Sequence, residues 1–120
     1  MASTPDDHAH VRVCVPVTAD RQVAGSWGRA ERLAVVSVAA GLPVEWVEHD
    51  VAWDRLHDEG PEGAHHARVA RFLREQHVDV VVAVHMGRPM QHMLDKLGIR
   101  SQLGARGDAT AAVVAAATAS

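Results

Sequence analysis

The chain contains one cysteine, one lysine and no tyrosine in 120 residues, and these shortages limit the kinds of protein to which it can belong. Because Cys14 is the only cysteine, no disulfide forms within the chain, and its thiol fits a reducing compartment. Lys96 is the only lysine among twelve basic residues, and the formal net charge is -3. Nucleic-acid binding normally needs a clustered basic surface, so the sequence predicts no nucleic-acid partner.

Targeting and membrane-spanning segments are also lacking. The first ten residues, MASTPDDHAH, are polar and lack the apolar core of a signal peptide. The most apolar run near the other end, residues 109–117, is too short and too rich in alanine to cross a bilayer. We therefore predict a cytoplasmic protein with no membrane partner.

Valine and alanine make up most of the 48% hydrophobic content. Such small and β-branched residues are typical of strands that are buried on both faces of an α/β sheet. A length of 120 residues fits a single domain with one core. The excess of alanine and valine, together with arginine in place of lysine, indicates a bacterial genome rich in G and C.

The hydrophobic pattern predicts an α/β domain over residues 10–120 after a disordered start at residues 1–9. Period-2 alternation and valine runs indicate strands, whereas apolar residues three and four apart indicate helices. The predicted order is β-β-β-α-β-α-β-α, a mixed five-stranded sheet with helices on both faces. The predicted segments are strands 11–17, 33–38, 44–49, 78–84 and 99–103, helices 64–76, 89–98 and one after Asp108, and polar loops 18–29 and 50–63.

Several short motifs occur in a characteristic order. They are Val13-Cys-Val-Pro-Val17, Ser26-Trp-Gly-Arg-Ala30, His77-Val-Asp-Val-Val-Val-Ala83, and Leu97-Gly-Ile99 leading to Leu103-Gly104. In this order the chain resembles the dinitrogenase iron–molybdenum cofactor family over about residues 11–118. The resemblance implies a ribonuclease-H-like α/β fold and a role in carrying the nitrogenase cofactor or its precursors.

The resemblance places cofactor-binding residues in two loops. They are Ser26, Trp27, Gly28 and Arg29 in the first loop, and Met86 and Gly87 after the fourth strand. Ser26 and Trp27 stand where the family usually has histidine and phenylalanine. Val84, His85 and Met86 stand before Gly87, where the family commonly has two glycines and an apolar residue. These departures favour a different metal centre over the nitrogenase cofactor.

Histidine and methionine side chains are the candidate metal ligands. His85 follows a buried strand and precedes a helix, and ligands of open α/β sheets bind outside the carboxyl ends of the strands. His65 and His66 open the first long helix, and Met90 lies in the first turn of the next. Imidazole and thioether groups suit copper, iron or zinc, as an ion or a metal–sulfur cluster. Cys14 and His57 stay open as further ligands.

We therefore predict a protein that binds a metal or metal–sulfur cofactor, as a carrier, store or sensor, with a protein partner that receives the cofactor. One alternative is a small metalloenzyme with an open coordination position, because three histidines and a water suffice. A nuclease is disfavoured because the first strand carries no carboxylate. Another alternative is an interaction module without cofactor. Oligomeric state is open, and a homodimer sharing a histidine-rich site is one arrangement.

Overall fold

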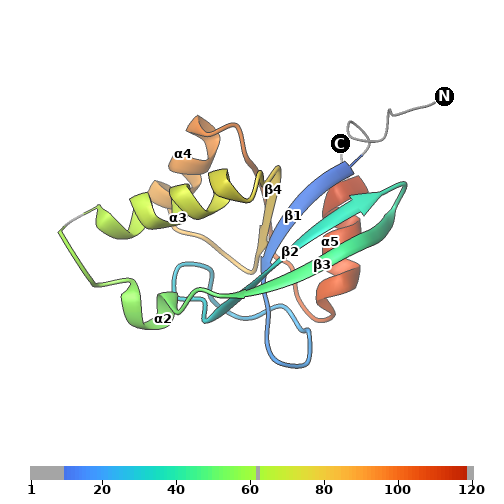
Figure 1. The fold of residues 1–120 in the computed structure, drawn as a ribbon, viewed down its shortest axis with the longest axis horizontal. Helices are drawn as coiled ribbons and strands as arrows, with labels where there is room; N and C mark the ends of the chain where they lie inside the picture. Colours follow the sequence, from blue (N-terminus) through green and yellow to red (C-terminus); the bar gives the residue numbers. More distant parts are fainter. Residues whose placement is uncertain (1–9, 62, 119–120) are drawn as a thin grey trace.

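A computed structural model describes residues 10–61 and 63–118, so the predicted disordered start at residues 1–9 lies outside the described residues. Five strands and four helices follow one another along the described chain (Figure 1). They are β1 His10–Pro16, β2 Arg32–Ala39, β3 Leu42–Asp50, α2 Trp53–Leu56, α3 Ala64–Glu75, β4 Val80–Ala83, α4 Arg88–Lys96, β5 Arg100–Leu103 and α5 Ala109–Thr118.

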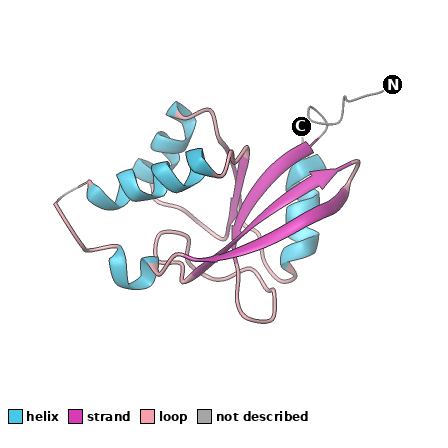
Figure 2. Ribbon diagram, in the orientation of Figure 1, coloured by secondary structure: helices cyan, strands magenta, loops and turns pink. Residues whose placement is uncertain are grey.

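The strands form one mixed sheet in the order β3-β2-β1-β4-β5 (Figure 2). β1 pairs antiparallel with β2, and β2 with β3, so the predicted hairpin is confirmed. β4 pairs parallel with both β1 and β5. The predicted mixed five-stranded α/β domain is therefore confirmed. Since β1 and β4 are parallel, the loops that follow them begin at the same edge of the sheet.

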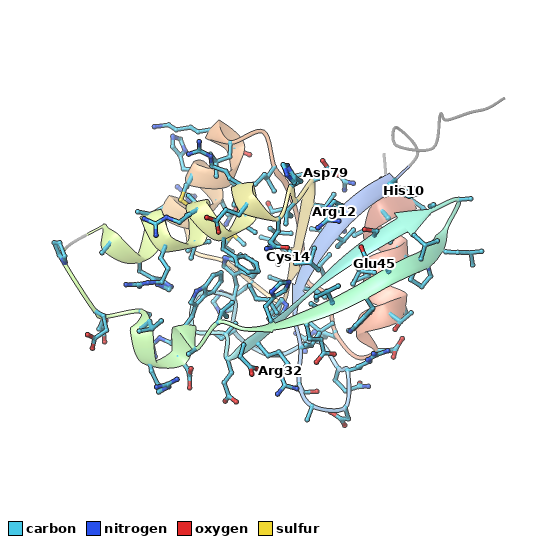
Figure 3. All side chains as sticks on the ribbon, viewed as in Figure 1. His10, Arg12, Cys14, Arg32, Glu45 and Asp79 are labelled. Atoms are coloured by element: carbon cyan, nitrogen blue, oxygen red, sulfur yellow. The ribbon has the colours of Figure 1, made fainter. Side chains whose placement is uncertain are left out.

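The alternation of β1 divides its side chains between two cores. Val13 and Val15 face α5, and Cys14 faces α3 and α4. Cys14 lies in the middle of the sheet (Figure 3), paired with Val35 of β2 and Val81 of β4. Complete burial raises the pKa of the Cys14 thiol far above its ordinary value. The thiol is therefore a small apolar group of the core.

The two cores differ in composition. The α5-side core consists of Val13, Val15, Val17, Ala34, Val36, Val38, Val80, Val82, Ala109, Val113 and Ala116. The helix-pair core, under α3 and α4, consists of Cys14, Trp27, Ala30, Leu33, Val35, Trp53, Val69, Leu73, Val78, Val81, Ala83, Met86, Met90, Leu94 and Ile99. In α3 and α4 the buried residues are spaced four apart, as expected for one face of a helix.

The prediction of an uninterrupted polar loop over residues 50–63 is wrong. β3 continues to Asp50, and the four-residue helix α2 follows at Trp53–Leu56. Trp53 is only 2% exposed, and its ring meets those of Trp27 and Phe72 edge to face at 5.4 and 5.9 Å. A helix of one turn is too short to produce a periodic pattern, which is why the sequence did not predict it.

β4 spans Val80–Ala83 and is shorter than the predicted strand 78–84, and Asp79 joins its start to β1. The Arg12 amide donates to the Asp79 carboxylate at 2.9 Å, and the Asp79 amide donates to the Arg12 carbonyl at 2.8 Å. Arg12 and Asp79 lie side by side in Figure 3.

At the other end of the chain, the Asp108 carboxylate accepts the Ala111 amide at 2.8 Å, which confirms the predicted cap of α5. None of the described helices is long and apolar enough to cross a membrane.

Candidate functional site

A cavity of about 740 Å³ opens at the edge of the sheet where β1 and β4 end. Three segments form its walls: the loop after β1, the connection from α2 into α3, and the turn from β4 into α4. Its lining residues are Ser26, Trp27, Gly28, Arg29, His57, Asp58, Glu59, Gly60, Pro61, Gly63, His65, His66, His85, Met86, Gly87, Pro89 and Met90.

The ten residues predicted for the site all line this cavity. They are Ser26, Trp27, Gly28, Arg29, His65, His66, His85, Met86, Gly87 and Met90. His57, which the sequence left open, lines it too, whereas Cys14 lies inside the core and does not. The structure thus brings the candidates together, and their roles as ligands stay predictions.

Trp27 presents an unused hydrogen-bond donor. The residue is 2% exposed and lines the cavity. Its indole Nε1 is buried and has no hydrogen-bond partner within the described part of the chain. A buried donor without an acceptor is costly, and such groups in native proteins usually have a reason. Since Nε1 itself has no accessible surface, an acceptor atom of a ligand would reach it after a small rotation of the ring.

Two glycines of the wall are not required by the fold. Neither Gly28 nor Gly87 has a positive φ, so any residue can adopt its backbone conformation. A Cβ at Gly28 would meet nothing within 4 Å, and one at Gly87 would meet only the Pro89 Cδ at an ordinary 3.8 Å. Gly60 and Gly63, by contrast, have φ of 89° and 88° and are needed for their turns. The space next to Gly28 and Gly87 is therefore free for a ligand.

The His65 ring is held on both nitrogens. Its Nε2 lies 2.7 Å from the Gly28 carbonyl oxygen, and its Nδ1 lies 3.0 Å from Nη1 of Arg68. The pKa of His65 is lowered, chiefly by burial, against the raising effect of the Gly28 carbonyl and with a further lowering by the Arg68 charge. Burial therefore favours the neutral form of His65, and a metal ion would have to displace one of these partners.

The other three cavity histidines differ in their partners. His57 directs Nδ1 to the carbonyls of Trp53 and Asp54 at 3.2 and 3.1 Å, and Nε2 to the Asp58 carboxylate at 3.2 Å. Within the described residues, the rings of His66 and His85 have no hydrogen-bond partner. His85 is exposed and His66 is half-buried. These two imidazoles are thus the ones free to bind a ligand.

The cavity does not contain a complete ion site formed by the protein. Over residues 10–61 and 63–118, no group of three or more His, Cys, Asp or Glu side chains could hold a metal ion. The three-histidine centre required by the metalloenzyme alternative is therefore not preformed there. Met86 and Met90 are 7% and 6% exposed and belong to the helix-pair core, so their thioethers both pack and line the cavity.

Two helices begin at the cavity without a side-chain cap. The N-cap residues are Gly63 for α3 and Gly87 for α4, and neither supplies a capping hydrogen bond. The first amides of a helix and its dipole favour an anionic ligand. The lining contains one cation, Arg29, and two carboxylates, Asp58 and Glu59, so the two helix N-termini mark the part of the site that suits a negatively charged group.

Sequence reasoning missed two residues that shape the site. Trp53 places its ring edge to face with those of Trp27 and His65, the latter at 5.6 Å, and so supports two walls. Its signal was a lone tryptophan in a polar segment. Arg68 contacts the His65 ring, the Leu56 carbonyl at the end of α2 and the Glu59 carbonyl of the α2–α3 connection. Its signal was its position three residues after His65 on the same helix.

Solved structures share this fold at low sequence identity. The crystal structure of PH0822 has a TM-score of 0.70 at 18% identity, covering 89% of this chain and 88% of that one. The apo form of the orange protein from Desulfovibrio gigas has a TM-score of 0.66 at 21% identity, covering 88% and 86%. The NifB-like Thermotoga protein TM1290, of the DUF35 family, has a TM-score of 0.61 at 25% identity, covering 88% and 85%.

No curated protein matches the sequence. The sequence profile of the family described as "Dinitrogenase iron-molybdenum cofactor" matches residues 9–120, nearly the whole chain. The match agrees with the motifs, the order of elements and a cavity lined by the loops that carry those motifs. The chain belongs to the dinitrogenase iron–molybdenum cofactor family, and its function is associated with a metal cofactor.

Proposed function

We propose that the chain binds a metal–sulfur cofactor in this cavity and serves as its carrier, store or sensor, on a fold of the ribonuclease-H-like type. The observation that carries the proposal is the pair Gly28 and Gly87. Both line the cavity, and neither backbone conformation nor internal packing explains the missing side chain. Room for a closely approaching ligand explains it.

The donor set favours a cofactor that brings its own ligands over a bare ion. A metal ion bound by the protein alone usually needs three or four side-chain ligands. The cavity offers His66 and His85 as free imidazoles, with the buried thioethers of Met86 and Met90 as weaker donors. Two strong ligands leave the coordination incomplete, and inorganic sulfide in the cofactor would complete it.

The remaining residues fit an anionic metal–sulfur group. The first amides of α3 and α4 would donate hydrogen bonds to its sulfur atoms, and Arg29 would balance its charge. The Trp27 indole N–H would join these donors after a small rotation of the ring. Met90 contributes an apolar surface that limits the access of water. When bound, the cofactor would supply the metal centre, while these side chains bind and orient it.

One structure of the same fold supports a role in which the cofactor is bound and released. The orange protein of the same fold was solved in an apo form, so that protein exists without its bound group. His85 is exposed at the turn after β4, where a receiving protein or a second copy of this chain would reach it. A carrier therefore implies a protein partner that takes up the cofactor, or a homodimer that shares it.

The experiment compares glycine variants after anaerobic reconstitution with ferrous iron and sulfide, with and without molybdate. Gly28→Ala and Gly87→Ala each add a methyl group at the wall, and crowding a packed site by one methyl costs about 1–3 kcal/mol, which corresponds to a loss of affinity of about 5- to 150-fold. We expect metal retention after desalting to fall about that much. Gly25→Ala is the matched control, since Gly25 also has free space and no positive φ but lies outside the cavity lining.

Unfolding midpoints in urea check that the three variants fold alike. Retention that is equal in wild type and in both cavity variants would contradict the proposal. Metal that binds as well without sulfide as with it would contradict the choice of a cluster over an ion.

A further inference from the structure

A chain of hydrogen bonds links two segments of the cavity wall through the first turns of α3. The Gly28 carbonyl in the first loop accepts from Nε2 of His65 at 2.7 Å. Nδ1 of His65 then lies 3.0 Å from Nη1 of Arg68. Residues 28 and 65 are far apart in sequence, so this contact fixes how the loop lies against the helix.

The partners define the protonation state of the His65 ring. A carbonyl oxygen only accepts hydrogen bonds, so Nε2 carries the hydrogen. A guanidinium group only donates, so Nδ1 presents its lone pair to Arg68. No lone pair of the ring is left over for a metal ion. His65 thus differs from His66, the next residue on the helix, whose ring has no partner within the described chain.

Arg68 extends the network to the opposite wall. Its Nη1 also donates to the Leu56 carbonyl at 2.9 Å, and its Nη2 donates to the Glu59 carbonyl at 3.4 Å. The first carbonyl ends α2 and the second belongs to the connection between α2 and α3, which contributes residues 57–61 to the cavity lining. A single arginine therefore holds the α2–α3 connection and orients the histidine that holds the first loop.

We propose that His65 and Arg68 are positioning residues that set the width of the cavity, and that His65 is not a metal ligand. His65 fixes the loop containing Trp27 and Gly28, and Arg68 fixes the α2–α3 connection against the same helix. The consequence for cofactor uptake rests on the proposed function, whereas the effect on the two walls holds for the metal-free protein.

Two variants of His65 separate positioning from ligation. His65→Gln keeps an N–H donor that reaches the Gly28 carbonyl, but an amide is a poor ligand for the metals that imidazole binds. His65→Ala removes both the N–H donor and the imidazole that could bind a metal. Arg68→Met keeps the aliphatic length of the side chain and removes its donors.

The first readout is backbone hydrogen exchange of the metal-free chain, followed by mass spectrometry at fixed pH. Losing a hydrogen bond of ordinary strength should speed local opening about fivefold. We expect faster exchange for His65→Ala at the Ala30 amide, which donates to the Trp27 carbonyl, and unchanged exchange in α5. For Arg68→Met we expect faster exchange at the His57 and Glu59 amides, which donate to the Trp53 and Leu56 carbonyls, and again no change in α5. His65→Gln should restore protection of the Ala30 amide. His66→Ala is the matched control and should leave exchange in both walls unchanged.

The second readout is retention of iron and sulfide after reconstitution. We expect His65→Gln to retain them nearly as well as wild type and His65→Ala to retain several-fold less. Unchanged exchange in the walls of both His65→Ala and Arg68→Met would overturn the proposal. Wild-type protection of the walls combined with lost retention in His65→Gln would overturn it as well, since His65 would then be a ligand. If wild type itself retains nothing, the proposed function fails, and the exchange experiment still decides the positioning role.

Discussion

The two faces of the sheet are packed with different kinds of residue. The buried members of the α5-side core are all valine or alanine. The helix-pair core contains both buried tryptophans, the two buried methionines and all the buried leucines. Figure 1 shows the matching difference in cover: α5 lies alone on one face, while α3 and α4 lie on the other.

This difference explains why the cavity lies on one side. Small side chains let an alanine-rich helix lie close to the sheet and fill the space evenly. No residue of the α5-side core lines the cavity. On the other face the large side chains support loops at the edge of the sheet, and the cavity lies between those loops. The buried nitrogens without a partner in the described residues, Trp27 Nε1 and His49 Nε2, also belong to this side, where His49 packs on Phe72.

The largest expected effect tests how much each core stabilises the fold. Leu73 of α3 and Val113 of α5 are both fully buried. Leu73→Ala should lower the free energy of unfolding by about 2–5 kcal/mol, because it removes apolar burial and leaves a cavity. Val113→Ala removes less apolar surface from the core and should lower the free energy of unfolding by about 2 kcal/mol. Urea unfolding measures both values.

Cofactor retention should distinguish the same two faces. Val113→Ala should retain iron and sulfide as wild type does once corrected for the folded fraction, because α5 does not contribute to the cavity. A larger stability loss for Val113→Ala than for Leu73→Ala would contradict the difference in packing between the two faces. A loss of retention in folded Val113→Ala would contradict the assignment of the cofactor to one face.

A smaller effect on stability is expected at Trp27. Trp27→Phe keeps a ring in contact with Trp53 and removes the indole N–H that has no partner in the described chain. Removing an unsatisfied buried donor offsets the smaller ring, so the free energy of unfolding should change by less than about 1 kcal/mol. Retention of iron and sulfide should still fall several-fold, because one hydrogen bond to the cofactor is lost. A large loss of stability with normal retention would show that this N–H serves the fold alone.

Much of the fold could be predicted from local patterns. Valine alternation predicted β1, Gly41 and Pro43 predicted the hairpin, and Pro89 predicted the start of α4. The neighbourhood of the candidate residues was also predictable, since loops that follow parallel strands begin at one edge of the sheet. All ten candidates line one cavity for that reason.

The rest depends on contacts between distant residues. The hydrogen bond between His65 and Gly28 joins residues 37 apart, and no sequence pattern marks it. The prediction that treated His65 and His66 alike as ligands therefore missed their difference in hydrogen bonding. Trp53 was assigned to a polar loop because its helix has only four residues. Burial in the aromatic cluster, which determines its conformation, appears only in three dimensions.

The central claim is that the cavity holds a metal–sulfur cofactor, and elemental analysis tests it most directly. The chain should be purified without oxygen from cells that produce it, alongside Gly28→Ala, and analysed for metals and acid-labile sulfide per chain. We expect metal and sulfide together in the wild type and much less of both in Gly28→Ala. Metal-free wild-type protein that also takes up none from iron and sulfide, or metal without sulfide in equal amounts in both proteins, would contradict the account.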